Sequence, residues 1–178
     1  MAKKKNKSGG GKLLIKDDCL APQKTLSLTY EGPNTMKIAT QTSAFFSNFF
    51  KVSSAGWAEQ DFRFDNSGDN LEFYARWWVR KSMSAYSELF WEITVQGEEN
   101  KNTKKGRFSL VIDADVEHRF PENWALRGIF WMYHYLLYDR LRRDWIKRCS
   151  ELAYGFRELL KQEFGIIKSP KKSVETFQ

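Results

Sequence analysis

The residue types best suited to chemistry gather in one short segment of the chain. Residues 113–118 read D-A-D-V-E-H, so three acids occupy alternate positions. Alternate side chains of a β-strand project from one face, where carboxylates would hold a divalent metal or, with Glu92, form an acid/base pair. Arg76 and Arg80 of a neighbouring segment should share that face and neutralise it. We therefore interpret residues 113–118 as a salt-bridged outer face.

A histidine in an apolar stretch is the second candidate for chemistry. His134 lies between Phe130 and Leu137, at positions that share one face of a helix. No second histidine, cysteine or carboxylate follows it at the spacing of a metal or catalytic site. We interpret His134 as a hydrogen-bonded residue of the core or of a pocket. The sequence contains no phosphate loop, nucleophile elbow or cofactor motif, so we expect a non-enzymatic protein without cofactor or metal.

Positive charge is concentrated at the two ends of the chain and at two places within it, residues 101–107, which we call the hairpin tip, and residues 140–148. The net charge is +7, and residues 1–16 carry six lysines and no acid. Lysine and arginine neutralise phosphates, and arginine binds them through two parallel hydrogen bonds. The candidate nucleic-acid-binding residues are Lys3, Lys4, Lys5, Lys101, Lys104, Lys105, Arg140 and Arg143.

Alternating apolar and polar residues predict the elements that position these groups. We expect a strand at 25–30, a helix from 34 or 35 to about 51, and a connector at 13–22. Strands should follow at 57–65, 71–80, 86–96 and 107–119, with the polar residues 97–106 as a long loop. On the outer face of these strands, Trp78 and Phe90 lie among arginines and could stack nucleic-acid bases.

One long amphipathic helix is predicted from 121 to 165. Oppositely charged residues recur four positions apart, as in the pairs Asp139/Arg143 and Lys147/Glu151. An apolar stripe continues through the segment and is interrupted by Arg148; its members are Phe130, Leu137, Leu141, Trp145, Leu152, Phe156 and Leu159. Pro121 would begin the helix and Gly165 would end it. Such a helix would be about 65 Å long. A domain of this size is about 40 Å across, so the helix should break, project or pair with another chain.

This order of elements predicts a two-layer α+β domain, in which an antiparallel sheet of about five strands packs on the long C-terminal helix and on a shorter N-terminal helix. It resembles the order in helix-grip domains, in which a curved antiparallel sheet wraps a long C-terminal helix. We expect residues 1–16 to be a disordered basic arm, 17–165 to be the domain, and 166–178 to be a flexible basic tail.

The two cysteines, Cys19 and Cys149, form neither a metal motif nor a disulfide framework, so we expect free thiols. No apolar run approaches the roughly 20 residues of a membrane span, and no secretory signal is recognisable. We therefore expect a cytoplasmic protein.

Three functions are compatible with this pattern. The leading hypothesis is a binding or scaffold protein whose basic arms and hairpin tip contact an anionic partner, most plausibly RNA or a ribonucleoprotein. The second is a carrier of a small apolar ligand between sheet and helix. Its pocket would be lined by Trp77, Trp91, Phe108, Tyr133, His134 and Leu137. The third is an assembly subunit that pairs with itself or with another protein through residues 139–165.

Overall fold

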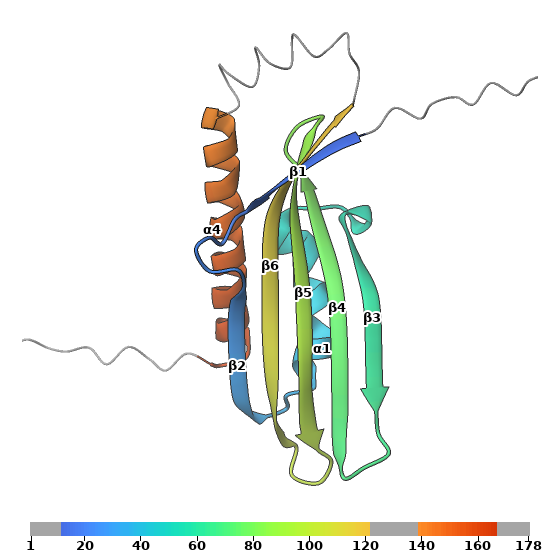
Figure 1. Cartoon of the computed structure of the whole chain (residues 1–178). Helices are drawn as coiled ribbons and strands as arrows, with labels where there is room; N and C mark the ends of the chain where they lie inside the picture. Colours follow the sequence, from blue (N-terminus) through green and yellow to red (C-terminus); the bar gives the residue numbers. More distant parts are fainter. Residues whose placement is uncertain (1–11, 122–138, 167–178) are drawn as a thin grey trace, which may run out of the picture.

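The apolar–polar alternation produces a sheet of six antiparallel strands in the computed structural model, which describes residues 12–121 and 139–166 (Figure 1). The strand order is β1-β6-β5-β4-β3, and β2 also pairs with β6. Alternate residues of the long strands are buried, so one face is apolar and the other is polar. The strands are β1 (Lys12–Asp18), β2 (Leu26–Pro33), β3 (Trp57–Asp65), β4 (Asn70–Ser82), β5 (Ser87–Asn100) and β6 (Lys105–Pro121).

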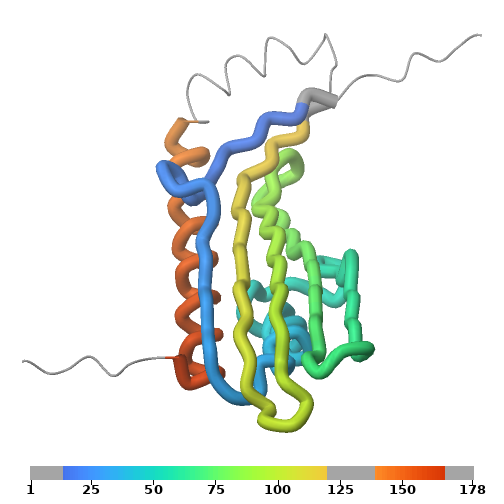
Figure 2. Tube along the Cα trace, turned by 60° about the horizontal axis from the view of Figure 1, so that its bottom comes forward, coloured from blue at the N-terminus to red at the C-terminus, as the bar shows by residue number. Residues whose placement is uncertain are grey.

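The strands β1 and β2 share one edge of β6. Asp18 lies opposite Asp115 and Leu26 lies opposite Ile112, so both strands run in the same direction along it (Figure 2). They are two parts of one edge strand, separated by residues 19–25. Residues 12–18 form the strand β1, so the prediction of a connector at 13–22 is wrong for residues 13–18. The predicted disordered arm, 1–16, likewise extends too far, because its residues 12–16 belong to this strand.

The predicted long loop at 97–106 is wrong as well. The strand β5 extends to Asn100 and β6 begins at Lys105, which leaves a short turn between them. Gly97 lies within β5, and a Cβ atom there would come within 2.5 Å of the Arg107 carbonyl oxygen, 2.6 Å of the Phe73 ring and 2.8 Å of the Phe108 Cβ atom. The glycine therefore allows the β6 backbone and the Phe73 ring to approach β5 closely.

A short helical segment follows β2 and covers the apolar face. It consists of α1 (Lys37–Gln41), the 3₁₀ turn η1 (Thr42–Phe45) and α2 (Phe46–Phe50), and η2 (Ser54–Gly56) leads into β3. The predicted helix is thus present, but Thr35 does not cap it. Instead the carboxylate of Glu99 on β5 accepts the backbone N–H of Met36 at 2.9 Å, so the sheet itself caps α1.

The long C-terminal helix is α4 (Asp139–Glu163), which lies over β2, β5 and β6 (Figure 1). Gly165 has a φ of 64° and follows its end, as predicted. The prediction that Pro121 begins the helix is wrong, because Pro121 is the last residue of β6. The buried stripe of α4 is Trp145, Cys149, Ala153, Phe156 and Leu160.

Aromatic rings fill the space between the apolar face and the helices. Phe50 lies 4.6 Å from the Trp91 ring and 5.1 Å from that of Phe156, while Phe46 lies 5.9 Å from Trp77. Rings at these separations add attraction beyond the area they bury. The described helices cover the apolar face of the sheet, which confirms the predicted α+β class with an antiparallel sheet, a long C-terminal helix and a shorter N-terminal one.

Candidate functional site

Trp78 and Phe90 lie on the outer face of the sheet, as the alternation in the sequence predicts. The Arg80 guanidinium lies 4.9 Å from the Trp78 ring centroid and 5.3 Å from that of Phe90. The ammonium of Lys16 lies 5.6 Å from the same Phe90 ring. These cations already occupy positions over the rings that a nucleic-acid base would need.

Carboxylates outnumber cations on this outer face. Glu92 lies directly opposite Asp113, and the pKa of Asp113 is raised by burial and then by the charge of Glu92. A phosphate backbone would be repelled by this surface, so the face suits a neutral or cationic ligand better than RNA. The outward carboxylates are Asp18, Glu31, Asp61, Asp65, Glu72, Glu88, Glu92, Glu98, Asp113, Asp115 and Glu117, and the outward cations are Lys16, Arg63, Arg76, Arg80, Lys105, Arg107 and Arg119.

Of the three acids in residues 113–118, Glu117 forms ion pairs with Lys16 and Arg119, whereas Asp113 and Asp115 have no ion pair within the described residues. Arg76 lies 2.6 Å from Glu92, and Lys16 lies 2.5 Å from Glu117. Burial alone would raise the pKa of Glu117, but hydrogen bonds from Lys16 and Arg119 bring it below its usual value. Within residues 12–121 and 139–166, no group of histidine, cysteine and carboxylate side chains is arranged to hold a metal ion.

A hollow of about 820 Å³ lies on the outer face, near the turns that end β3 and β5. Polar side chains of three adjacent strands line it, among them Tyr74, Gln96 and Ser109. Its two guanidinium groups are already paired, since Arg63 lies 2.6 Å from Asp61 and Arg107 lies 2.8 Å from Glu98. The hollow can therefore offer hydrogen bonds, but little net positive charge.

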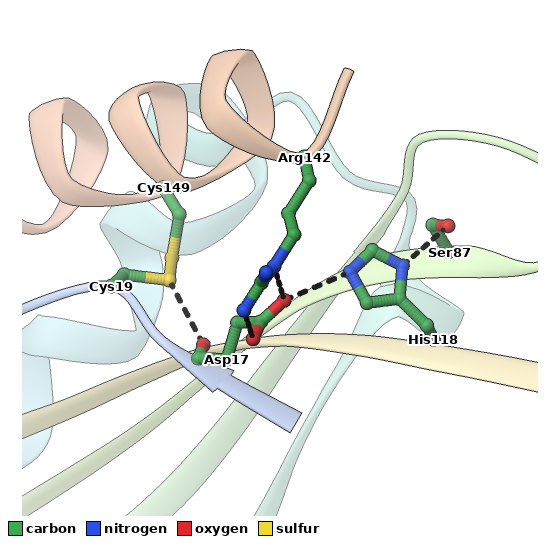
Figure 3. A network of polar contacts seen from close by, with 6 residues as sticks. All are labelled: Asp17, Cys19, Ser87, His118, Arg142 and Cys149. Carbon is green, nitrogen blue, oxygen red and sulfur yellow. Dashed lines mark hydrogen bonds and ion pairs between the residues drawn. A yellow bond between two sulfur atoms is a disulfide. The ribbon is translucent and has the colours of Figure 1, made fainter. Parts of the chain in front are cut away.

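On the inner face, a polar cluster joins β1, β5 and β6 to the beginning of α4 (Figure 3). Nδ1 of His118 lies 2.8 Å from the Ser87 hydroxyl, and its Nε2 lies 3.4 Å from the Asp17 carboxylate. The Arg142 guanidinium donates two hydrogen bonds to the same carboxylate, one of them 2.7 Å long from Nε. The Trp145 ring packs against His118 at 5.6 Å.

These are the residue types of a serine hydrolase, yet the surroundings favour a structural role. Ser87 is 5% exposed and His118 is fully buried, so a substrate could not reach the hydroxyl. The Asp17 charge is neutralised by Arg142 instead of being available to an imidazolium. The sequence interpretation missed this cluster, because its members lie far apart in the chain and become neighbours only through strand pairing.

A disulfide bond lies next to this cluster. The sulfurs of Cys19 and Cys149 are 2.14 Å apart, so the prediction of free thiols is wrong. Cys19 follows β1 directly, and Cys149 belongs to the buried stripe of α4. The bond therefore ties the edge of the sheet to the helix, 130 positions away in the sequence.

Cations from three elements converge beside the first half of α4. The pKa of Lys81, at the end of β4, is lowered by burial and then by the positive charges of Arg148 and Lys51. Lys51 ends α2, and Arg148 lies on α4; both are exposed. In the described part of the chain no carboxylate lies within ion-pair distance of these three residues. We call Lys51, Lys81 and Arg148 the cationic junction; sequence spacing gave no sign of it.

The predicted nucleic-acid-binding residues do not form one surface. Arg140 and Arg143 are exposed near the start of α4, on the same helix as Arg148. Residues 101, 104 and 105 lie at the β5–β6 turn, beside the other end of α4, where Phe164 packs on Phe108. Lys101 donates hydrogen bonds to the carbonyls of Asn66, at 2.7 Å, and Gly68, so its charge stabilises the neighbouring turn. Lys3, Lys4 and Lys5 lie outside the described residues.

The predicted lining of an apolar pocket is only partly within the described chain. Trp77 and Trp91 are fully buried and Phe108 is 3% exposed, all three on the inner face. The indole of Trp77 donates a hydrogen bond to Glu59 at 3.1 Å. Tyr133, His134 and Leu137 lie outside the described residues.

Comparison with known proteins gave no relative: no protein-family model, curated protein or solved structure matches this chain. No described helix is both long enough and apolar enough to cross a membrane. The function must therefore be inferred from the chain's own surfaces.

Proposed function

We propose that the protein is a non-enzymatic binding protein that holds an anionic partner, RNA or a ribonucleoprotein, at the cationic junction. The observation that carries this proposal is the convergence of Lys51, Lys81 and Arg148 from three elements, where no carboxylate of residues 12–121 and 139–166 lies within ion-pair distance. Like charges brought together cost free energy, and a bound phosphate removes that cost.

The neighbouring charges extend the proposed site along α4. Arg140, Arg143 and Lys147 are exposed on this half of the helix, where they add to the field of Arg148. Arginine is suited to phosphate by its planar, two-pronged geometry. The lysines of residues 1–16 would add sequence-independent attraction, while the acidic outer face would keep the partner on the helical side.

The test is binding of a fluorescently labelled single-stranded RNA, measured by anisotropy over a range of salt concentrations. The variant Lys51→Gln/Arg148→Gln removes two charges from the junction. Each lost phosphate contact should flatten the slope of log affinity against log salt by about 0.7, so we expect a change of about 1.4. Lys81 is left intact, because its ammonium donates to the Phe50 carbonyl at 2.7 Å.

The matched control is Lys104→Gln/Lys105→Gln, which removes two charges at the opposite end of α4 and should leave the slope unchanged. Equal losses in the two variants would mean that net charge alone governs binding. No RNA binding by the wild type at low salt would exclude the proposal. A third variant, with Lys3, Lys4 and Lys5 replaced by Gln, measures what the arm contributes.

The disulfide bears on where this binding takes place. Disulfides are rare in a reducing cytosol, so the cytoplasmic location predicted from the sequence is retained only as a proposal. Alkylation of free thiols under denaturing conditions, in protein taken directly from its native cells, would test it, because both cysteines are buried in the folded protein. Labelling of both cysteines would agree with a reducing compartment, and protection of both would exclude it.

A further inference from the structure

The strand β3 forms an edge of the sheet and exposes two phenylalanines. Phe62 is 41% exposed and Phe64 is 52% exposed. Their neighbours across β4, Ala75 and Phe73, are buried on the inner face. The apolar face of the sheet therefore continues onto β3, but there its side chains remain in contact with water.

Within residues 12–121 and 139–166, the β3 backbone also has no partner strand on one side. Among the strands of the described chain, β3 pairs only with β4. An edge strand presents N–H and C=O groups that can pair with another strand. The exposed rings and the open edge lie on the same few residues, and both would be covered by one added strand.

We propose that a second copy of this chain adds that strand, with the two β3 strands antiparallel and a twofold axis at Phe62. Each Phe62 then lies opposite the partner's Phe62 on the inner face. On the outer face each Asp61 lies opposite the partner's Arg63, and each Arg63 lies opposite the partner's Asp61. The two sheets become one continuous sheet across the axis.

The charges on β3 favour this register over the registers that result when the twofold axis is moved along the strand. Moving the axis to Arg63 would bring the two Arg63 side chains together and set each Asp61 against an Asp65. Moving the axis by half a residue would place apolar side chains against charged ones. An axis at Phe64 also pairs opposite charges, Arg63 with Asp65, but it uses only the last residues of β3.

The ion pair between Arg63 and Asp61 of one chain is compatible with the proposed pairing of two chains. Arg63 holds Asp61 within its own strand at 2.6 Å. A carboxylate accepts several hydrogen bonds, so each Asp61 can retain its own Arg63 and also accept from the partner's Arg63. The paired segment is short, because the register of β3 against β4 shifts between Glu59 and Asp61. We therefore expect a dimer that dissociates on dilution.

The test uses two charge variants of the full chain, Asp61→Arg and Arg63→Asp, and measures mass by sedimentation velocity at increasing concentration. Alone, Asp61→Arg sets arginine against arginine and Arg63→Asp sets aspartate against aspartate. Each should dimerise at least about tenfold more weakly than the wild type. Mixed in equal amounts, they face each other with opposite charges and should form a heterodimer, detected by native mass spectrometry.

Circular dichroism of each variant alone verifies that it is folded. Tyr154→Ser on the exposed side of α4 is the matched control and should dimerise like the wild type, which separates the β3 edge from pairing through the helix. A wild type that stays monomeric at the highest concentration overturns the proposal. Single variants that dimerise normally, or a mixture that does not recover the dimer, overturn it as well.

Discussion

The two halves of α4 are held to the sheet by different interactions. The first half is joined by the Arg142–Asp17 ion pair, the Trp145–His118 contact and the Cys149–Cys19 bond. The second half is held by apolar packing, with Phe156 against the rings of α2 and Leu160 fully buried. Apolar packing is indifferent to pH and redox state, whereas the first set of contacts depends on both. The contacts of the first half of α4 depend on pH and redox state, and we call them the conditional attachment. The contacts of the second half depend on neither, and we call them the apolar attachment.

Phe50→Ala should produce the largest loss of stability, because it removes the ring at the centre of the apolar half. Phe50 is fully buried and lies 4.6 Å from Trp91 and 5.1 Å from both Phe49 and Phe156. Truncation of such a ring costs about 3–5 kcal/mol. Urea unfolding followed by tryptophan fluorescence measures the loss.

Tyr154→Ala is the control for that substitution, because its ring is 37% exposed and contacts Arg157 from the solvent side of α4. It should cost less than about 1 kcal/mol. If the two substitutions cost the same, α4 is not held by the aromatic cluster.

Reduction of the Cys19–Cys149 bond should produce the next largest effect. The bond closes a loop of 130 positions, and removal of a native disulfide costs about 2–4 kcal/mol. Unfolding in urea with and without dithiothreitol measures this difference. The double variant Cys19→Ala/Cys149→Ala should unfold at the same urea concentration with or without reductant. Two reactive thiols in the unreduced, denatured wild type would contradict the expectation.

The sequence was sufficient to predict the apolar attachment, and the reason is periodicity. Alternation along the strands identified the inner face with Trp77 and Trp91, and the helical repeat identified Trp145 and Phe156 on α4. These signals are local, so one sequence contains them. The stripe is nevertheless centred one position away from the prediction, because Cys149 occupies the core position that the prediction left to Arg148, which is exposed.

The conditional attachment could not be predicted from the sequence, because the residues that form it share no local sequence pattern. Asp17, Ser87 and His118 become neighbours only after β1, β5 and β6 pair in one register. The same holds for the cationic junction of Lys51, Lys81 and Arg148. The strand β1 itself was missed because its segment, K-L-L-I-K-D-D, directly follows a lysine- and glycine-rich stretch, and its pairing with residues 115–121 is not visible in a single sequence.

Arg142→Met should have a smaller effect than loss of the disulfide. The substitution keeps the aliphatic length of the side chain but leaves the Asp17 carboxylate, 8% exposed, without its two hydrogen bonds. Loss of such bonds to a buried charged group costs about 1–3 kcal/mol. Arg140→Met, at an exposed position on the same turn of α4, should be close to neutral. Equal effects in the two variants would mean that the ion pair contributes nothing to holding the helix.

The smallest expected effect is a dependence of stability on pH that comes from His118. Burial lowers the pKa of His118 below its ordinary value; the Asp17 carboxylate acts in the opposite direction and the Arg142 charge acts with burial. In the unfolded chain the histidine pKa is about 6.5, so between the two values the unfolded chain binds more protons than the native one. Stability should therefore be complete above about pH 6.5 and should fall as the pH is lowered toward the native pKa.

Urea unfolding at several pH values between 5 and 8 measures this slope, with His118→Gln as the matched variant. The substitution should flatten the slope in that window, while the contribution of His134 is common to both proteins. The sign is the decisive observation. If the Asp17 charge outweighed burial, the native pKa would be raised, and the wild type would gain stability relative to His118→Gln as the pH fell. A gain of that kind would mean that His118 is charged in the native protein, and the first half of α4 would then be attached by a triad of charges instead of by an ion pair beside a neutral ring.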